Sequence, residues 1–208
     1  KSDASWDRWD VDENADVVIS ILKELGISSC NIVGWSMGSA VAMSIAKKNK
    51  PLVNKLVLIT PFSWLGGAVY SDKVAFKIFV SFVRIRERLF PNFNPKSKFS
   101  FLKKSNSIND EYTEWAWNNL HKSKDDFIYA DGGRFVVPYD ARPWIQEIEA
   151  ETLVITGGRD KLVPEETSND VVKRLNEVKV KTFPDAGHSV PWTHEEDLLT
   201  ELREFFSL

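Results

Sequence analysis

The stretch that decides the fold is CNIVGWSMGSAVAMSIAKK, residues 30–48. Its apolar start, residues 30–33, is too short for a helix and predicts a buried strand. Residues 40–48 have helical composition, so the Gly-Trp-Ser-Met-Gly segment at 34–38 is the turn between a strand and a helix. In that context, a Gly-x-Ser-x-Gly turn presents its serine at the tip of a sharp bend. Ser36 is therefore our candidate nucleophile, in preference to an exposed serine in an ordinary tight turn.

The residues around Ser36 suit nucleophilic catalysis. We expect Gly34 and Gly38 to relieve crowding against neighbouring backbone at a strained nucleophile. The following helix points its amino terminus at the site, which places the Met37 N–H to bind a developing oxyanion. A serine hydroxyl needs a base, and a histidine base needs a partner that fixes its tautomer.

Strands and helices alternate on both sides of this stretch. Two further buried strands are predicted at residues 56–59 and 152–156, and a fourth strand is predicted at 178–183. Further helices are predicted at residues 12–25 and 164–175 and from Thr193 onward, the last with a capping box reaching Glu196. The apolar face of this last helix is predicted to hold Leu198, Leu199, Leu202, Phe205 and Phe206. The alternation indicates an α/β fold whose mostly parallel sheet is covered by helices on both faces.

An insertion interrupts this alternation. Residues 61–150 hold 18 of the 25 aromatic residues, mostly on helical-looking stretches such as 74–90 and 108–121. We therefore expect a core made of residues 1–60 and 147–208, with a helical cap at 61–146.

Three histidines are candidates for the base. His121 lies in a polar stretch, and His194 stands beside two glutamates at the start of the last helix, so both are expected at the surface. His188 follows the strand 178–183 at its carboxyl end, where open α/β sheets build their sites. We predict that His188 is the base.

The acid is predicted to be Asp160, which follows the strand 152–156. On its own, this aspartate would read as a helix cap or an ion-pair partner. The order Ser36, Asp160, His188 is the one expected of an α/β-hydrolase. The alternative acid position, after the strand 56–59, holds Thr60-Pro61-Phe62, and Asp185 is too close to His188 in sequence to be preferred.

Three motifs now make a resemblance plain: Gly34-Trp35-Ser36-Met37-Gly38, Gly158-Arg159-Asp160-Lys161-Leu162-Val163-Pro164 and Ala186-Gly187-His188. They resemble the nucleophile, acid and histidine motifs of capped α/β-hydrolases. The resemblance runs from about residue 12 to the end, and the insertion falls where that family carries its helical cap.

The resemblance also implies a partial chain. Capped α/β-hydrolases have about four further strands before the helix at 12–25, and a His-Gly motif in that region donates the second oxyanion N–H. At typical element lengths, roughly 60–100 residues are missing. The strand that includes Val33 would then be an exposed apolar edge.

Composition argues against nucleic acid and a membrane as binding partners. A formal net charge of −3 gives no basic field for nucleic acid. The single cysteine, Cys30, has apolar neighbours and is expected to be a buried structural thiol. No apolar run is long enough for a membrane span. We expect no cofactor or metal and a cytoplasmic location, and the oligomeric state stays open.

The sequence thus predicts a serine hydrolase for an apolar carboxylic ester, with Trp35 and Met37 on the floor of its acyl pocket. Thioesterase, C–C bond hydrolase and perhydrolase share the same three catalytic residues and stay open. So do a hydrolase-fold receptor with slow turnover and an inactive fragment. An aspartate nucleophile, as in epoxide hydrolases and haloalkane dehalogenases, is disfavoured by Ser36.

Overall fold

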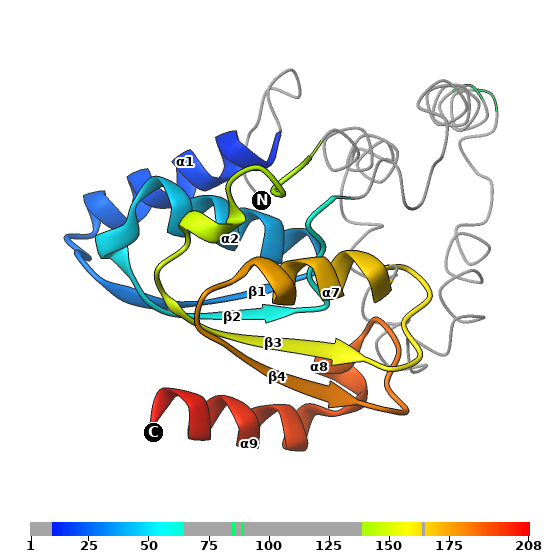
Figure 1. Ribbon diagram of the computed structural model, residues 1–208. Coiled ribbons are helices and arrows are strands. Elements are labelled where there is room, and N and C mark those ends of the chain that lie inside the picture. The colour runs from blue at the N-terminus through cyan, green and yellow to red at the C-terminus, as the bar shows by residue number, and fades with distance from the viewer. Residues whose placement is uncertain (1–9, 65–84, 86–88, 90–138, 164) are drawn as a thin grey trace.

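The computed structural model describes residues 10–64, 85, 89, 139–163 and 165–208 (Figure 1). Within them, four parallel strands form one sheet in the order β1-β2-β3-β4. The strands are β1 (Cys30–Trp35), β2 (Val53–Ile59), β3 (Glu151–Gly157) and β4 (Val178–Phe183). All four predicted strands are confirmed, and so is the parallel sheet.

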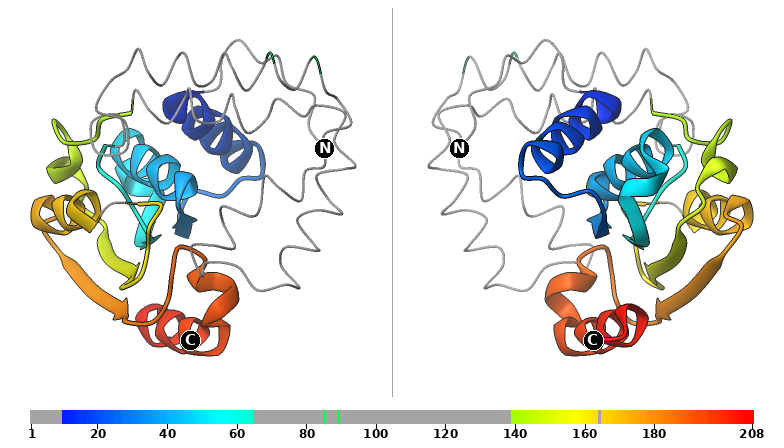
Figure 2. Two further views of the ribbon diagram at one scale, coloured as in Figure 1. Left: turned by 90° about the vertical axis from the view of Figure 1, so that its right-hand side faces the viewer. Right: turned by 90° about the vertical axis from the view of Figure 1, so that its left-hand side faces the viewer.

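Helices cover both faces of the sheet, as predicted (Figures 1 and 2). On one face lie α1 (Val11–Glu24), α2 (Met37–Lys48), α7 (Glu165–Arg174) and the short 3₁₀ turns η1 (Lys50–Leu52) and η2 (Ile145–Glu147). On the other lie α8 (Val190–Thr193) and α9 (Glu195–Phe206).

The second half of β2, residues 56–59, is continuously apolar because both of its faces are buried. Leu56 and Leu58 point into the core cluster on the α1, α2 and α7 side, together with Met43 and Val171. The alternate residues, such as Val57, point into the second cluster under α8 and α9. Successive side chains of a strand face opposite sides, so a strand buried on both faces must be apolar at every position.

The helix α1 begins and ends where the sequence indicates, within one residue. The Asp10 side chain caps its amino terminus by accepting a hydrogen bond from the Glu13 N–H at 2.7 Å. Gly26, at φ +70°, lies in the left-handed region that commonly ends a helix.

The last predicted helix is in fact two helices, and its predicted capping box is wrong. Thr193 ends α8, and its hydroxyl donates to the Ser189 carbonyl at 3.2 Å and lies 2.9 Å from His194 Nδ1. A threonine at the end of one helical turn bonds back to the carbonyl four residues earlier and is not available as a cap. His194 is the N-cap residue of α9 and makes no side-chain capping bond. Leu199, predicted on the apolar face, is exposed.

The strand β1 is an edge of the described sheet, in accord with the expected exposed apolar edge. Its Val33 is 47 % exposed. Cys30 was expected to be buried but is half-buried, because it begins this edge strand and packs only partly against the core. Its partial burial still raises the pKa of the Cys30 thiol, which suits a structural role.

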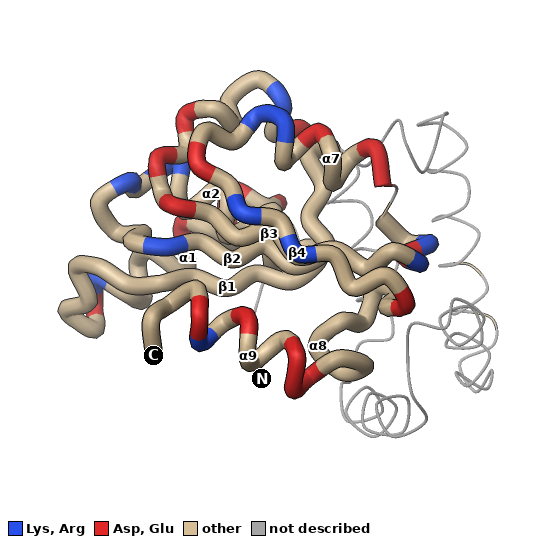
Figure 3. Tube along the Cα trace, turned by 60° about the horizontal axis from the view of Figure 1, so that its bottom comes forward, with Lys and Arg blue, Asp and Glu red and all other residues tan. Residues whose placement is uncertain are grey.

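Basic and acidic residues are interspersed along much of the described chain, while acidic residues predominate on α9 (Figure 3). Lys179 on the edge strand β4 pairs with Glu151 at 2.9 Å, and Lys55 reaches the same carboxylate at 3.3 Å. Lysines on an edge strand discourage pairing with another chain. None of the described helices is both long and apolar enough to cross a membrane.

Both ends of the predicted cap segment pack into the core. Phe62 and Ile145 are buried, and Trp64 forms an antiparallel bridge with Asp140. The rest of the predicted helical cap, with His121 and most of the aromatic residues, lies outside the described residues.

Candidate active site

The candidate nucleophile stands at a strained position between β1 and α2. Ser36 has φ 53° and ψ −120°, a conformation that is unfavourable for a residue with a side chain. Two backbone hydrogen bonds hold it there: the Ser36 N–H donates to the Ile59 carbonyl, and the Ser39 N–H donates to the Ser36 carbonyl, both at 2.9 Å. Strain that is fixed in this way is typical of functional sites.

The two glycines of the motif differ in their surroundings. A Cβ on Gly34 would lie 2.4 Å from the Gly38 carbonyl oxygen, so the turn closes only with glycine at that position. A Cβ on Gly38 would meet no described atom within 4 Å, so the expectation that Gly38 also relieves crowding is wrong. Gly38 is the second residue of α2, and the space where its Cβ would lie is open among the described residues.

We expect Gly34→Ala to destabilise the fold and Gly38→Ala to spare it. The first substitution forces backbone apart and should cost about 3 kcal/mol or more of unfolding free energy. The second removes backbone entropy from the unfolded chain and should change that free energy by no more than about 1 kcal/mol. Urea unfolding of both variants measures the difference, and equal midpoints would contradict this account of the turn.

The candidate acid is held by backbone amides. Asp160 Oδ1 accepts hydrogen bonds from the N–H groups of Leu162 and Val163, at 2.8 and 3.1 Å. This leaves Oδ2 facing His188, and the aspartate side chain is only 8 % exposed. The two backbone N–H groups thus fix the orientation of the carboxylate independently of its contact with His188.

The imidazole of His188 joins the other two predicted residues. Its Nδ1 lies 2.9 Å from Asp160 Oδ2, and its Nε2 lies 2.8 Å from Ser36 Oγ. The histidine side chain is 9 % exposed, so these hydrogen bonds operate largely out of water, where electrostatic interactions are stronger. The structure therefore brings Ser36, His188 and Asp160 into one hydrogen-bonded chain.

Close contact between two loops makes this meeting possible. A Cβ on Gly157 would lie 2.3 Å from the Gly187 carbonyl oxygen, and one on Gly158 would lie 2.7 Å from that of Pro184. The Arg159 N–H also donates to the Ala186 carbonyl at 2.9 Å. Glycines at these two positions therefore let the acid loop and the histidine loop touch.

The remaining titratable candidates lie elsewhere. Asp185 is exposed and pairs with His194 at 3.2 Å. The hydrogen bond from its own backbone N–H, and then the one from His194, lower the pKa of the Asp185 carboxyl. His194 is half-buried against Phe183, so its expected surface position is confirmed only in part. Within the described part of the chain, no three His, Cys, Asp or Glu side chains come together as a metal site would require.

The two predicted pocket residues flank the nucleophile. Met37 is the first residue of α2, where backbone N–H groups have no intrahelical acceptor, and it is 43 % exposed. Trp35 ends β1, is half-buried, and donates its Nε1–H to the His188 carbonyl at 2.9 Å. Sequence reasoning did not anticipate this hydrogen bond.

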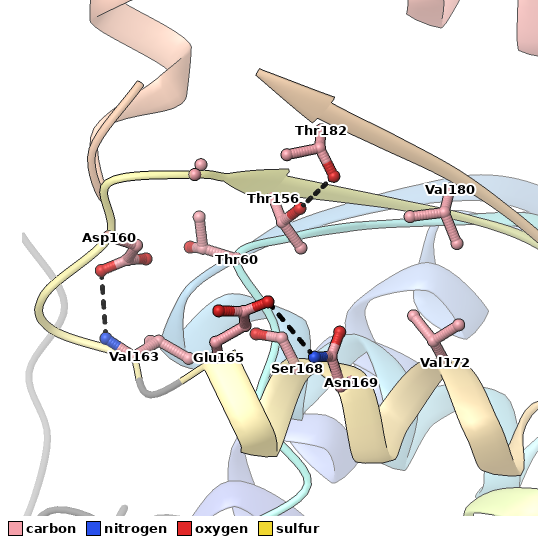
Figure 4. A pocket seen from close by; sticks show the side chains of 12 residues that line it. Thr60, Thr156, Asp160, Val163, Glu165, Ser168, Asn169, Val172, Val180 and Thr182 are labelled. Atoms are coloured by element: carbon pink, nitrogen blue, oxygen red, sulfur yellow. Dashed lines mark hydrogen bonds between the residues drawn. The ribbon is translucent and has the colours of Figure 1, made fainter. Parts of the chain in front are cut away.

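A small cavity of about 140 Å³ lies on another side of Asp160 (Figure 4). Its lining is mostly polar and includes Thr60, whose buried hydroxyl has no hydrogen-bond partner among the described residues. Thr60 occupies the alternative acid position at the end of β2. The cavity is smaller than typical ligand pockets, and Ser36 does not line it, so we do not assign it to substrate.

A family model described as the alpha/beta hydrolase fold matches residues 1–195. The chain belongs to the α/β hydrolase fold family. The resemblance drawn from the three motifs is thereby confirmed, and so is the fold class.

Curated relatives within this family are similar over most of the chain. A 2-hydroxy-6-oxo-6-phenylhexa-2,4-dienoate hydrolase from Burkholderia cepacia is 27% identical over 194 residues, which is 88% of this chain. A 2-hydroxy-6-oxononadienedioate/2-hydroxy-6-oxononatrienedioate hydrolase from Comamonas testosteroni is 26% identical over the same length. The chain spans 64% of the length of each of these two relatives.

Solved structures agree on the fold. An esterase from Exiguobacterium antarcticum superposes with a TM-score of 0.81 at 18% identity, over all of this chain and 78% of that one. An enol-lactonase from Burkholderia xenovorans gives a TM-score of 0.73 at 15% identity, over 96% of this chain and 74% of that one.

Proposed function

We propose that this α/β-hydrolase is a serine hydrolase that uses Ser36 as nucleophile, His188 as base and Asp160 as the orienting acid. The observation that carries the proposal is the hydrogen-bonded chain Ser36 Oγ–His188 Nε2 and His188 Nδ1–Asp160 Oδ2, at 2.8 and 2.9 Å. The three residues follow β1, β4 and β3, at the end of the sheet where such folds build their sites.

The reaction follows from this geometry. As Ser36 Oγ bonds to the substrate's carbonyl carbon, its proton passes to His188 Nε2. Asp160 Oδ2 accepts the hydrogen bond from the Nδ1–H of His188 and stabilises the imidazolium, while the Met37 N–H at the start of α2 binds the oxyanion. The leaving group then departs with the proton from Nε2 and leaves an acyl-enzyme. Water then adds to the acyl carbon while His188 Nε2 takes its proton. His188 returns this proton to Ser36 Oγ as the carboxylic acid product departs.

The proposed substrate is a carboxylic ester with an apolar acyl group. Met37 and the exposed part of Trp35 are its proposed pocket floor, and residues 61–146 are the proposed cap that closes over it. Support comes from the aromatic content of that segment, because ligand pockets are lined mainly by apolar and aromatic groups. A charged or sugar ester fits this composition less well.

Lengthening the acyl chain should raise activity. Each buried CH₂ contributes on the order of 0.8 kcal/mol, so kcat/KM should rise by about 10² between an acetyl and a hexanoyl ester. A series of p-nitrophenyl esters from acetate to laurate measures this. A steady fall in activity from acetate onward would refute the apolar pocket.

Hydrolysis of a C–C bond is the second candidate, because the relatives named above are hydrolases of 2-hydroxy-6-oxo-dienoates. Such a reaction needs the same nucleophile and base but a carbon leaving group. We expect the two functions to separate in one assay pair: loss of the dienoate chromophore of 2-hydroxy-6-oxo-6-phenylhexa-2,4-dienoate against release of p-nitrophenol from the hexanoyl ester. The higher kcat/KM identifies the function.

The receptor alternative is tested by the time course with the hexanoyl ester. An enzyme gives steady release of p-nitrophenol over many turnovers. A receptor that keeps the catalytic residues releases one equivalent of p-nitrophenol per chain in a burst, and almost no further release follows.

A further inference from the structure

The side chain of Trp35 links the nucleophile to the histidine loop. Trp35 immediately precedes Ser36, and its indole Nε1–H donates to the backbone carbonyl of His188 at 2.9 Å. The indole also lies against the imidazole, with ring centroids 5.5 Å apart and planes at 38°. On another side it meets the Trp192 ring, edge to face, at 4.5 Å.

This link matters because the two reacting side chains come from distant parts of the sequence. Ser36 and His188 are 152 residues apart, so the distance from Oγ to Nε2 depends on how the histidine loop sits against the end of β1. The hydrogen bond from Arg159 to Ala186 ties the histidine loop to the β3 side. Trp35 ties it to β1.

We propose that Trp35 is a positioning residue, which holds the backbone of His188 so that its imidazole reaches Ser36. The inference rests on the proposed function and deepens it. Tryptophan suits the task because its large ring packs in the core under α8 and α9 while its N–H reaches a carbonyl. The same side chain adjoins the nucleophile in sequence, so a shift of the histidine loop relative to Ser36 must break its hydrogen bond.

Trp35→Phe is the substitution that tests this. Phenylalanine keeps an aromatic ring in the cluster but removes the N–H donor. A misplacement of about 1 Å between reacting groups can cost 10²-fold in rate, so we expect kcat and the rate of Ser36 phosphonylation by a fluorophosphonate to fall about 10- to 100-fold. KM is expected to rise as well, because the smaller ring also alters the proposed pocket floor, so the test rests on the labelling rate and on the readout below.

Trp144→Phe is the matched control. Trp144 is also half-buried and packs against Tyr139 and Lys47 on the other side of the sheet, away from the site. It reports what a tryptophan-to-phenylalanine change costs in packing alone. The second readout, independent of activity, is the NMR line width of the His188 ring N–H proton, which should broaden through faster exchange with water in Trp35→Phe and stay unchanged in Trp144→Phe. Its chemical shift is not a readout, because the indole ring lies 5.5 Å from the imidazole and its removal changes that shift in any case.

The two readouts separate the two claims. An unchanged His188 line width in Trp35→Phe overturns the positioning role, whatever the labelling rate. A broadened line with slower labelling supports both the positioning role and the proposed function. A broadened line in a protein whose Ser36 never reacts supports Trp35 as the residue that positions His188 and overturns the nucleophile.

Discussion

Replacing Ser36 with alanine should lower kcat by about 10⁴- to 10⁶-fold and abolish labelling by a fluorophosphonate. Alanine removes the Oγ that lies 2.8 Å from His188 Nε2, and with it the atom that forms the proposed acyl-enzyme. The fold should survive, because Ser36 makes no side-chain capping bond to α2 and its backbone hydrogen bonds do not depend on the hydroxyl. Steady-state kinetics and mass spectrometry of the labelled protein measure the two effects.

Ser29→Ala is the matched control for this experiment. Ser29 hydrogen-bonds to the Asn54 side chain and precedes the same strand, far from His188. It should be labelled and should turn over like the parent protein. Labelling of a different serine, together with full activity of Ser36→Ala, would remove Ser36 from the proposal.

The strands β1, β2 and β3 were predictable because each contains a short apolar run that is decided locally. In residues 56–59 of β2, alternate side chains enter two different cores, so each of these positions is apolar and the run was visible without knowledge of the fold. The meeting of Ser36, Asp160 and His188 was predictable for a related reason. Carboxyl ends of neighbouring parallel strands share one edge, so residues that follow them are brought together by topology alone.

What the sequence did not reveal depends on contacts between distant segments. The need for glycine at Gly34 but not at Gly38 arises from the distance at which the turn passes its own helix. The hydrogen bond from Trp35 to His188 requires the sheet order and the course of the loop after β4. The pairing of His194 with Asp185 depends on the end of α8 at Thr193, immediately before His194, and on the contact of His194 with Phe183 of β4. No local pattern encodes such distances.

Asp160→Asn should lower kcat by about 10⁴-fold with little loss of stability. The substitution leaves the acid loop otherwise intact, because the asparagine carbonyl oxygen can keep both hydrogen bonds that Oδ1 accepts from Leu162 and Val163. The amide NH₂ then faces His188 Nδ1, where the carboxylate oxygen stood at 2.9 Å. A donor at that place favours the imidazole tautomer whose proton is on Nε2, and this tautomer is unable to accept the proton of Ser36. The same change in a serine protease costs about 10⁴ in kcat.

The control for this last prediction is Asp185→Asn, at the other aspartate near His188 in sequence. Asp185 pairs with His194 and its side chain is 67% exposed, so its loss should change kcat less than about threefold. Thermal unfolding of both variants checks that neither effect comes from loss of fold. An Asp160→Asn variant as active as Asp185→Asn would mean that the carboxylate beside His188 does not set its tautomer, because every other hydrogen bond of the acid loop is kept.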